Sequence, residues 1–429
     1  MGVRGLMPLL ARFAPRSITM PAESDLCGWT VAVDTNIYVQ RFFRGTDGGA
    51  DESRHLRGLH NMAQYMRSLD ITPLFVFDGK ARALGKEGEL LRRREDRERV
   101  RRELERERAR ARRIRVMTEI NARLLSDDAP PAASGRAGAS NDVALSTTAA
   151  AGWLRGEIDT LSGREPPRQT TIDFRMDRLE LEACRLILFR LGGLASLDGA
   201  ATASLDCVQA LDALQAHNAE RVATLARRGE TLTADKEAAC VELVRALGFA
   251  AHVVEAGEES EGVCAQLNRH GIVDAVCSED LDVVAFGGRL LRGFFAGESR
   301  QPLTLVDAQH ACAELGLTRA AFIDLCILCG TDFSATLEKV GPVTALRLVR
   351  EHGSIERILA TGKYRARAPF AVDLARAVFL ADPEPLPVAS RAQLHASAGP
   401  PDPAAVERLL PVVSAPPDGS DPFARGLVL

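Results

Sequence analysis

The chain has 429 residues, of which 46% are hydrophobic and 26% charged, so it is long enough to bury a full core and long for a single domain. It contains no run of 18 apolar residues and no signal-peptide pattern. We therefore expect no membrane span and an intracellular, non-secreted protein whose nine cysteines are reduced. The formal net charge of -4 argues weakly against a nucleic-acid partner, but the charges are spread unevenly.

Two short apolar runs near the N-terminus each end in an aspartate. Residues 31–34 read Val-Ala-Val-Asp34, and residues 73–78 read Pro-Leu-Phe-Val-Phe-Asp78. Such runs are typical of strands that are buried on both faces of a parallel sheet. In that class of sheet, ligands bind outside the carboxyl ends of the strands, where these two aspartates lie.

Residues 86–115 are strongly basic. Lys and Arg number 14 and Asp and Glu number 8, a net charge of +6, so the total of -4 leaves about -10 for the rest of the chain. The alternating signs predict a solvated helix with i,i+4 ion pairs, and the scarcity of apolar heptad positions disfavours a coiled coil. The alternatives are a phosphate-binding helix and a surface helix without a ligand.

A low-complexity stretch and further helical patterns follow. Residues 126–170 are rich in Ala, Gly, Ser and Pro, which predicts a flexible insertion. Residues 172–215 have the apolar spacing of helices, and residues 220–228 predict one more helix.

The stretch from Glu255 to Asp282 combines carboxylates with regular structure. The apolar spacing in its middle predicts a helix, which Gly271 ends. Residues 272–277 are an apolar run that predicts another buried strand. Asp280 and Asp282 follow that strand two residues apart, so in extended chain both can point the same way.

A helix is predicted for residues 322–332, which ends at Gly330 and carries Asp332 just beyond it. Cys326 and Cys329 form a CxxC pair within it. Because no second such pair exists, we interpret these cysteines as core residues rather than zinc ligands.

Seven carboxylates therefore share one kind of position, beside the end of a predicted strand or helix. They are Asp34, Asp78, Glu259, Glu261, Asp280, Asp282 and Asp332. Crowded carboxylates are tolerable where cations neutralise them, and oxygen-only ligands suit Mg²⁺ or Mn²⁺. The plainer alternative is a solvated acidic loop with Glu residues that stabilise a helix N-terminus. The alternation of strands and helices predicts an α/β fold with a mostly parallel central sheet flanked by helices.

On seven blocks of sequence, the chain resembles the structure-specific 5′ nucleases of the flap endonuclease/XPG family. In family order, the blocks are Met1-Gly-Val-Arg-Gly-Leu-Met-Pro-Leu-Leu10, Val31-Ala-Val-Asp34, Val76-Phe-Asp-Gly-Lys80, Glu259-Ser-Glu261, Ser278-Glu-Asp-Leu-Asp282, Leu325-Cys-Ile-Leu-Cys-Gly-Thr-Asp332 and Val340-Gly-Pro-Val-Thr-Ala-Leu346. They span about three-quarters of the chain. The resemblance implies a PIN-like 5′-nuclease fold with a helical arch and a helix-hairpin-helix-like module.

The resemblance implies a role for each carboxylate, since seven of them hold two divalent metals beside the scissile phosphate in that family. Matched by motif, four would serve mainly one Mg²⁺ or Mn²⁺, and these are Asp34, Asp78, Glu259 and Glu261. The other three, Asp280, Asp282 and Asp332, would serve the second ion. Two ions about 4 Å apart can activate a water and stabilise the leaving oxygen.

The basic helix falls where the family has the arch under which a single strand threads. Lys86 and Arg93 match the residues that steer the phosphate, and Arg92 and Arg94 are the fallback candidates. The chain departs from the family by roughly ninety residues inserted in this arch region, within 126–215.

Further DNA contacts are implied at the N-terminus and at the helix-hairpin-helix-like turn. Gly2, Gly341, Pro342 and Arg347 occupy the matching positions, and the turn often takes a monovalent cation in the family. Lys339 stands where a glycine is usual, so we expect a weaker grip on duplex DNA.

The predicted organisation has five parts. Residues 1–85 and 236–335 form the nuclease domain, 86–235 the arch region with the flexible insertion at 126–170, 336–383 the helix-hairpin-helix-like duplex-binding region, and 384–429 a Pro-rich tail with a short helix around 404–410.

The expected function is metal-dependent hydrolysis of branched DNA at a 5′ flap during replication, repair or recombination. The partner would be branched DNA with a 5′ single strand, or RNA; no PCNA-binding box of the sliding-clamp type is present in the tail. Alternatives are a 5′–3′ exonuclease of the same family, a viral mRNA-degrading relative, and a non-catalytic nucleic-acid-binding scaffold. We expect a nuclear location or a viral replication compartment.

Overall fold

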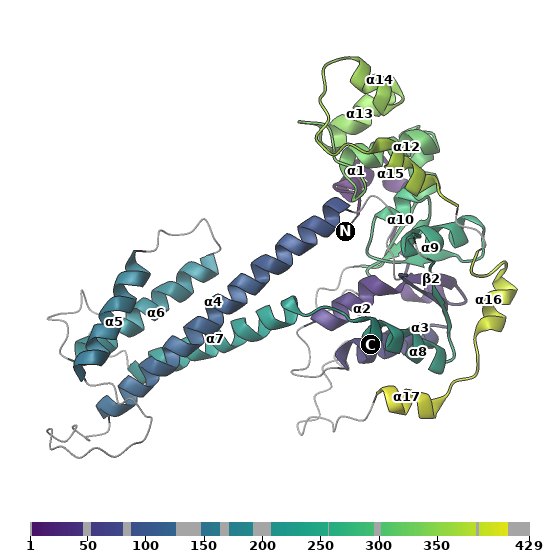
Figure 1. Cartoon of the computed structure of the whole chain (residues 1–429). Coiled ribbons are helices and arrows are strands. Elements are labelled where there is room, and N and C mark those ends of the chain that lie inside the picture. Colours follow the sequence, from purple (N-terminus) through teal and green to yellow (C-terminus); the bar gives the residue numbers. More distant parts are fainter. Residues whose placement is uncertain are drawn as a thin grey trace. The chain divides into compact units, whose positions relative to one another are not determined.

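The structure is a computed structural model, and it describes residues 2–45, 53–79, 87–125, 147–163, 171–191, 207–255, 257–295, 302–382 and 386–410. The chain divides into two units. Unit 1 comprises Met1–Arg94 and Thr231–Leu429, and unit 2 comprises Glu95–Glu230 (Figure 1).

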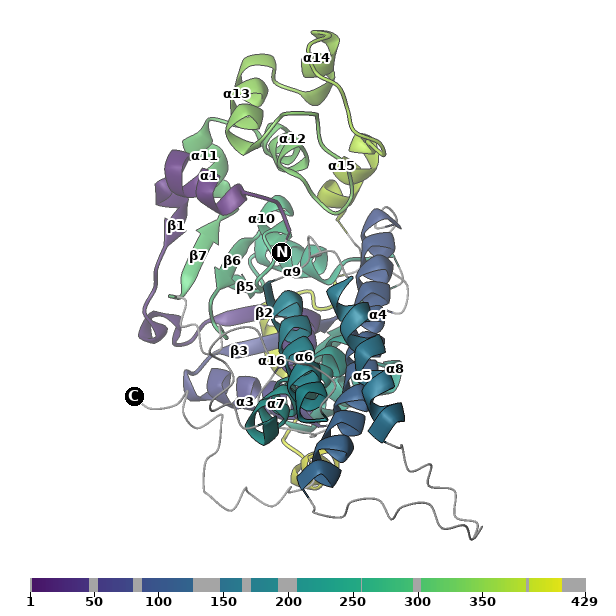
Figure 2. The same ribbon diagram turned by 90° about the vertical axis from the view of Figure 1, so that its left-hand side faces the viewer.

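A seven-stranded sheet organises unit 1, in the order β1-β7-β6-β5-β2-β3-β4 (Figure 2). The strands are β1 (Ile18–Thr19), β2 (Thr30–Asp34), β3 (Thr72–Phe77), β4 (Ala250–Val253), β5 (Ala275–Cys277), β6 (Arg289–Arg292) and β7 (Thr304–Asp307). Strands β6, β5, β2, β3 and β4 run parallel, whereas β7 is antiparallel to both β1 and β6. The predicted α/β fold with a mostly parallel sheet is confirmed.

The helices of unit 1 cover both faces of this sheet and continue beyond it, where α13 and α14 lie (Figure 1). They are α1 (Leu6–Phe13), α2 (Thr35–Arg44), α3 (Arg54–Ser68), α8 (Ala234–Ala246), α9 (Ser260–Arg269), α10 (Asp282–Ala285), α11 (Ala308–Leu315), α12 (Arg319–Cys329), α13 (Pro342–His352), α14 (Ile355–Ala360), α15 (Val372–Leu380), α16 (Arg391–Ser397) and α17 (Pro403–Leu409). Short 3₁₀ turns are η1 (Pro15–Ser17) and η2 (Glu23–Leu26).

The buried core has two layers because side chains alternate along each strand. On β2, Val31 and Val33 pack with α2, α3 and α8, whereas Ala32 packs with α1 and α9 to α13. All five residues of β2 are buried, as the apolar run predicted. Cys326 and Cys329 are buried in the second layer, which agrees with their interpretation as core residues.

Glycines end two of the predicted helices where the sequence placed their stops. Helix α9 runs to Arg269, and Gly271 just beyond it has a φ of 72°. Helix α12 ends at Cys329, and its C-cap Gly330 has a φ of 113°. Positive φ is costly for residues with a side chain, which explains glycine at both positions.

Unit 2 is built from helices alone among its described residues. They are α4 (Glu87–Leu125, which begins in unit 1), α5 (Thr147–Ser162), α6 (Thr171–Arg190) and α7 (Cys207–Gly229). Their apolar core includes Ile114 and Met117 of α4, Leu154 of α5, Ile187 of α6 and Leu214 of α7.

This unit differs from two sequence predictions. The segment 126–170, predicted to be a flexible insertion, contains α5, whose Leu154 is fully buried. The basic helix, predicted to be solvated, buries part of its C-terminal half, including Glu107 and Arg110. Both differences have one cause: the inserted helices α5 and α6 supply an apolar and charged partner surface for α4, which no local pattern reveals.

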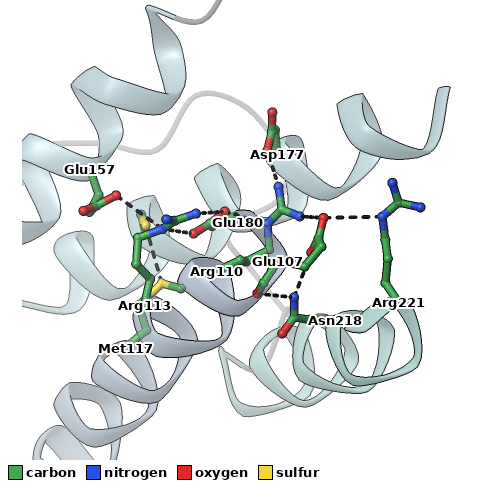
Figure 3. A network of polar contacts seen from close by, with 10 residues as sticks. Glu107, Arg110, Arg113, Met117, Glu157, Asp177, Glu180, Asn218 and Arg221 are labelled. Carbon is green, nitrogen blue, oxygen red and sulfur yellow. Dashed lines mark hydrogen bonds and ion pairs between the residues drawn. The ribbon is translucent and has the colours of Figure 1, made fainter. Parts of the chain in front are cut away.

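A buried ionic network joins all four helices of unit 2 (Figure 3). Arg110 of α4 contacts Glu107 on its own helix and Asp177 and Glu180 on α6, at 2.9 Å to Glu180. Arg113 of α4 contacts the same Glu180 and, at 3.5 Å, Glu157 of α5.

On the other side of the network, α7 bonds to Glu107. Asn218 Nδ2 donates to the Glu107 carboxylate at 2.8 Å and to its main-chain carbonyl at 3.0 Å, and Arg221 lies 3.4 Å from the carboxylate (Figure 3). Burial lowers the pKa of Arg110, but the hydrogen bonds and charges of Glu107 and Glu180 raise it above its ordinary value. Arg110 therefore remains charged inside the unit.

Among the helices that the structure describes, none is long and apolar enough to cross a membrane.

Candidate active site

The carboxyl ends of the parallel strands bring the predicted carboxylates to one edge of the sheet. Asp34 is the last residue of β2, and Asp78 directly follows β3. Asp280 lies in the turn after β5, and Glu261 is in the first turn of α9, which follows β4. Since β2 pairs with both β3 and β5, Asp34 lies centrally among these strand ends.

Asp34 is buried, with 2% of its surface exposed, and two serines hold its carboxylate. Ser278 donates to Oδ2 at 2.7 Å and Ser260 donates to Oδ1 at 3.1 Å. Burial, followed by the negative charge of Asp78 and to a lesser degree that of Asp280, raises the pKa of Asp34 to about 7, against the lowering effect of the two serines. Burial is thus the main cause of the shift, and the like charge of Asp78 adds to it.

Asp280 and Asp282 are both buried, and the main-chain N–H of Asp282 donates to Asp280 Oδ1 at 3.0 Å. Ser278 accepts a bond from the Asp280 N–H at 3.0 Å, so one hydroxyl links Asp280 to Asp34. Gly2 lies against this pair: a β-carbon there would sit 2.0 Å from Asp280 Oδ1. Only glycine fits at this position, because its φ is 79° and the Asp280 carboxylate fills the space that a β-carbon would need.

Asp78 and Glu261 complete the group that the structure brings together. Asn36, in the first turn of α2, donates to Asp78 Oδ2 at 2.9 Å. The hydroxyl of Ser260 lies 3.1 Å from Asp34 Oδ1 and 3.3 Å from Glu261 Oε2, so it lies between those two carboxylates.

For two predicted ligands, only the position of the adjoining helix indicates that they lie near this edge of the sheet. Glu259 is the N-cap residue of α9, and its side chain does not cap the helix. Asp332 lies half-buried beyond α12, and within the described residues no hydrogen bond or ion pair joins it to the other six carboxylates. Their assignment as metal ligands stays a prediction.

Neighbouring carboxylates outside the predicted set have other partners. Glu279, between Ser278 and Asp280, accepts a bond from the Gly293 N–H at 3.0 Å and pairs with Arg292 at 3.6 Å. Glu258 accepts a bond from the N–H of Glu255 at 3.3 Å, within its own turn. The selection of Glu261, Asp280 and Asp282 as ligands over these residues stays a prediction.

The donor set fits a hard divalent cation by its chemistry. All seven groups offer oxygen, the preferred ligand of Mg²⁺ and Mn²⁺, and a cation would relieve the repulsion that raises the pKa of Asp34. In the part of the chain that the structure describes, no three His, Cys, Asp or Glu side chains stand close enough together to hold an ion as they are. The chemistry supports a metal site, and its detailed geometry stays a prediction.

Two family models match the regions that supply this edge. Residues 1–100 match the XPG N-terminal domain and residues 251–332 match the XPG I-region. The first contains Asp34 and Asp78, and the second contains the other five carboxylates. In these two regions the chain is similar to the flap endonuclease/XPG family.

Relatives in this family match over part of their length. Flap endonuclease 1 of Ostreococcus tauri is 42% identical over 149 residues, which are 34% of this chain and 38% of the relative. Flap endonuclease 1-A of Sorghum bicolor is 41% identical over 150 residues, 34% of this chain and 39% of the relative. The chain thus spans about two-fifths of the length of the relatives it matches.

Among solved structures, the catalytic core of Rad2 in complex with DNA substrate is similar to the whole chain. The TM-score is 0.52 at 15% identity, with 100% of both chains covered. This likeness agrees with the family at the level of the fold.

The basic residues implied by the family are less completely described. Lys86 lies outside the described residues, as does the side chain of Arg93. Arg92 and Arg94 are exposed on the first turns of α4. The steering roles of all four remain predictions.

A helix begins where the resemblance implied a helix-hairpin-helix-like turn, and the role of this turn stays a prediction. Gly341 is the N-cap residue of α13 and Pro342 its first residue. Lys339, which stands at a usual glycine position, has a φ of 60°, so the left-handed backbone persists without the glycine. Arg347 is exposed and pairs with Glu351 at 3.4 Å, whereas Arg350 donates to the Leu315 carbonyl at 2.9 Å, as a structural contact.

Sequence reasoning missed the groups that orient the carboxylates. Ser260, Ser278 and Asn36 each bond to a predicted ligand. Their signal in the sequence was position, because each lies within two residues of a predicted ligand, where a short polar side chain is a natural hydrogen-bond partner.

Proposed function

We propose that this protein is a metal-dependent, structure-specific 5′ nuclease that hydrolyses phosphodiester bonds in branched DNA with a 5′ single strand. One observation carries the proposal: Asp34, Asp78 and Asp280 crowd one sheet edge, and the two family regions each contribute to it. A scaffold without catalysis has no use for a buried Asp34 whose charge is opposed by its neighbours.

The chain's own residues would prepare the site as follows. The carboxylates Asp34, Asp78, Glu259 and Glu261 would hold one Mg²⁺ or Mn²⁺, and Asp280, Asp282 and Asp332 the other. When bound, such a pair of ions supplies an activated water and offsets the charge on the phosphate. Ser260 and Ser278 fix the orientation of Asp34 in advance, so the site does not have to reorganise.

The arginines of the basic helix would serve binding and orientation. Lys86 and Arg93 would steer the scissile phosphate, with Arg92 and Arg94 adding contacts to the backbone of the single strand. The turn at Gly341 and Pro342, with Arg347 and a monovalent cation, would contact the duplex. An affinity spread over many phosphate contacts and falling with salt is the expected behaviour.

The two ends of β3 provide a matched test. Asp78 follows this strand, whereas Asp70 lies just before it at the opposite edge, exposed in a turn with a φ of 56° that asparagine tolerates. Asp78→Asn should lower the single-turnover cleavage rate of a 5′-labelled flap in Mg²⁺ by about 100-fold or more, while binding in Ca²⁺ stays near wild type. Asp70→Asn should cleave normally.

Substrate choice is tested on the wild-type protein with flap, nicked, blunt-duplex and RNA substrates. Preference for the flap supports the proposal, and preference for blunt duplex or RNA replaces it with the exonuclease or RNA-degrading alternative. Equal cleavage by wild type and Asp78→Asn would refute the metal-site assignment.

A further inference from the structure

A polar pocket lies at the opposite edge of the same sheet, away from the carboxylates. Its volume is about 280 Å³, and its wall includes Arg269 at the end of α9, Asp274 before β5, Arg289 at the start of β6 and Arg391 at the start of α16. Asp274 precedes β5 and Asp280 follows it, so the strand separates this pocket from the candidate active site.

Two of the arginines are held in place by one aspartate. Arg391 donates to Asp274 Oδ1 at 2.8 Å, while the Thr30 N–H donates to Oδ2 at 2.8 Å. Arg289 donates to the Asp274 carbonyl at 3.1 Å and pairs with Asp307 at 3.1 Å. These bonds leave other N–H groups of both guanidinium forks for a ligand and fix the forks before it arrives.

The remaining wall is also rich in guanidinium groups. Arg269 lines the pocket and pairs with Asp382. Behind Gly287, which is part of the wall, lies Arg319: a β-carbon on Gly287 would be 3.2 Å from the Arg319 guanidinium carbon and 3.3 Å from Arg269 Cδ. A glycine at this point therefore keeps the space between two arginines open.

The charges around the pocket do not balance. Three arginines, Arg269, Arg289 and Arg391, and two aspartates, Asp274 and Asp307, line the pocket, while Arg319 and Asp382 lie behind its wall. Asp307 is further engaged, because its Oδ1 accepts the N–H groups of Gln309 and His310 at the start of α11. Arg319 Nη1 is buried with no hydrogen-bond partner among the described residues. The excess charge is positive, and the guanidinium groups are hydrogen-bond donors, so the pocket suits an anion.

We infer that this pocket binds a small phosphate-bearing anion, either inorganic phosphate or the phosphate of a mononucleotide. Guanidinium forks match phosphate oxygens in pairs, and arginines oriented by aspartates are preorganised for that match. The volume is at the lower end for ligand pockets and suits one phosphate or one mononucleotide rather than a strand. The site is separate from the proposed nuclease centre and uses none of its residues.

The competing explanation is that these ion pairs only attach α16 to the sheet. The Arg269→Gln variant distinguishes anion binding from attachment of α16, because Arg269 takes no part in the bond between Arg391 and Asp274. Arg391→Gln tests the other wall, and Arg408→Gln is the control, since Arg408 is exposed on α17 in the same C-terminal segment and outside the pocket.

The test is isothermal titration of the full chain in EDTA, at constant ionic strength, with inorganic phosphate and with a deoxynucleoside 5′-monophosphate. EDTA removes divalent ions, so binding does not report the nuclease centre. Wild type and Arg408→Gln should bind, and Arg269→Gln should bind about tenfold or more weakly with an unchanged melting temperature. Arg391→Gln should weaken binding similarly.

Each outcome decides the matter. Tighter binding of the nucleotide identifies a nucleotide site, and equal binding identifies a phosphate site. The inference would be overturned if no binding heat were seen at millimolar ligand, or if wild type and Arg269→Gln bound with equal affinity. The arginines would then serve only to attach α16 to the sheet.

Discussion

Two clusters of buried charge in this protein follow opposite rules. At the carboxyl edge of the sheet, Asp34, Asp78 and Asp280 have the same sign, and the pKa of Asp34 is raised to about 7. In unit 2, Arg110 and Glu180 are equally buried but have opposite signs and short bonds to each other. The second cluster is satisfied by its own members, and the first is not.

The difference teaches how to separate structural from functional charge. A buried network in which every group has an oppositely charged partner is complete and needs no ligand. A buried group of like charges costs free energy until something from outside neutralises it, which is why perturbed carboxylates mark functional sites. The two regions therefore should respond to neutralising mutations in opposite directions.

The largest effect is expected in unit 2. Glu180→Ala should lower the free energy of unfolding of this unit by about 3–5 kcal/mol, because it leaves Arg110 and Arg113 buried without their shared partner. Glu182→Ala is the matched control on the same helix, since the Glu182 side chain is 52% exposed against 0% for Glu180.

The measurement can isolate unit 2 by fluorescence. The chain has two tryptophans, Trp29 in unit 1 and Trp153 in unit 2, so a Trp29→Phe background reports urea unfolding of unit 2 alone. Equal stability of the Glu180 and Glu182 variants would show that the network contributes nothing to unit 2.

The opposite sign is expected at the sheet edge. Asp34→Asn should raise the free energy of unfolding of the metal-free protein at pH 8 by about 1–3 kcal/mol, because it removes a charge that burial and Asp78 oppose. It should also abolish cleavage. The gain is measured by urea denaturation in EDTA, and a loss of stability would mean that the serine bonds outweigh the repulsion.

The same shift predicts a pH dependence. The folded state keeps a proton on Asp34 up to about pH 7, whereas the unfolded chain releases it near 3.8. Between these values the folded state binds more protons, so the stability of the metal-free wild type should fall as pH rises from about 4 to 7. The stability of the Asp34→Asn variant should not show this contribution to the fall, which urea denaturation at a series of pH values from about 4 to 7 would measure.

The smallest effect concerns the left-handed residue before α13. Lys339→Gly should stabilise unit 1 by about 1 kcal/mol, since glycine adopts a φ of 60° without the steric cost that a side chain carries. Lys339→Ala removes the charge but keeps the steric cost of a side chain at this φ, so it should not raise the stability. Thermal denaturation of both variants measures the difference, and equal melting temperatures would contradict the strain.

The sequence allowed the sheet edge to be predicted because its signal is local. Asp34 and Asp78 each end an apolar run, and parallel strands necessarily carry such ends to one edge. The bonding partners of Ser260 and Ser278 were not predictable, because that of Ser278 depends on the register of β2 against β5 and that of Ser260 on how α9 packs against β2. The opposite-edge pocket also needed the fold, since Arg391 lies far along the chain from Asp274.

Unit 2 was predicted less well for a physical reason. Glu107 and Arg110 alternate with exposed charges, and nothing in a run of Arg and Glu distinguishes the side chains that face α6 and α7 from those that face water. Burial of a charged helix depends on the charges of the partner helices. The partner helix α6 and its neighbour α5 follow sequence that is rich in Ala, Gly, Ser and Pro, which masks them in a sequence analysis.

The strand order also dictates when the sheet can be completed during synthesis. Strands β2 and β3 pair with each other, but their outer neighbours β5 and β4 emerge from the ribosome only after unit 2. Some 170 residues separate Phe77 from Ala250, which is roughly 10–30 s of translation at typical rates. For that interval the nascent chain presents a two-stranded ribbon with both edges unpaired and Asp34 still in water, while the helices of unit 2 can already close on themselves. The helical insertion can thus close before the sheet of unit 1 that surrounds it in the sequence, and the carboxylate edge is completed only once β4 and β5 have emerged.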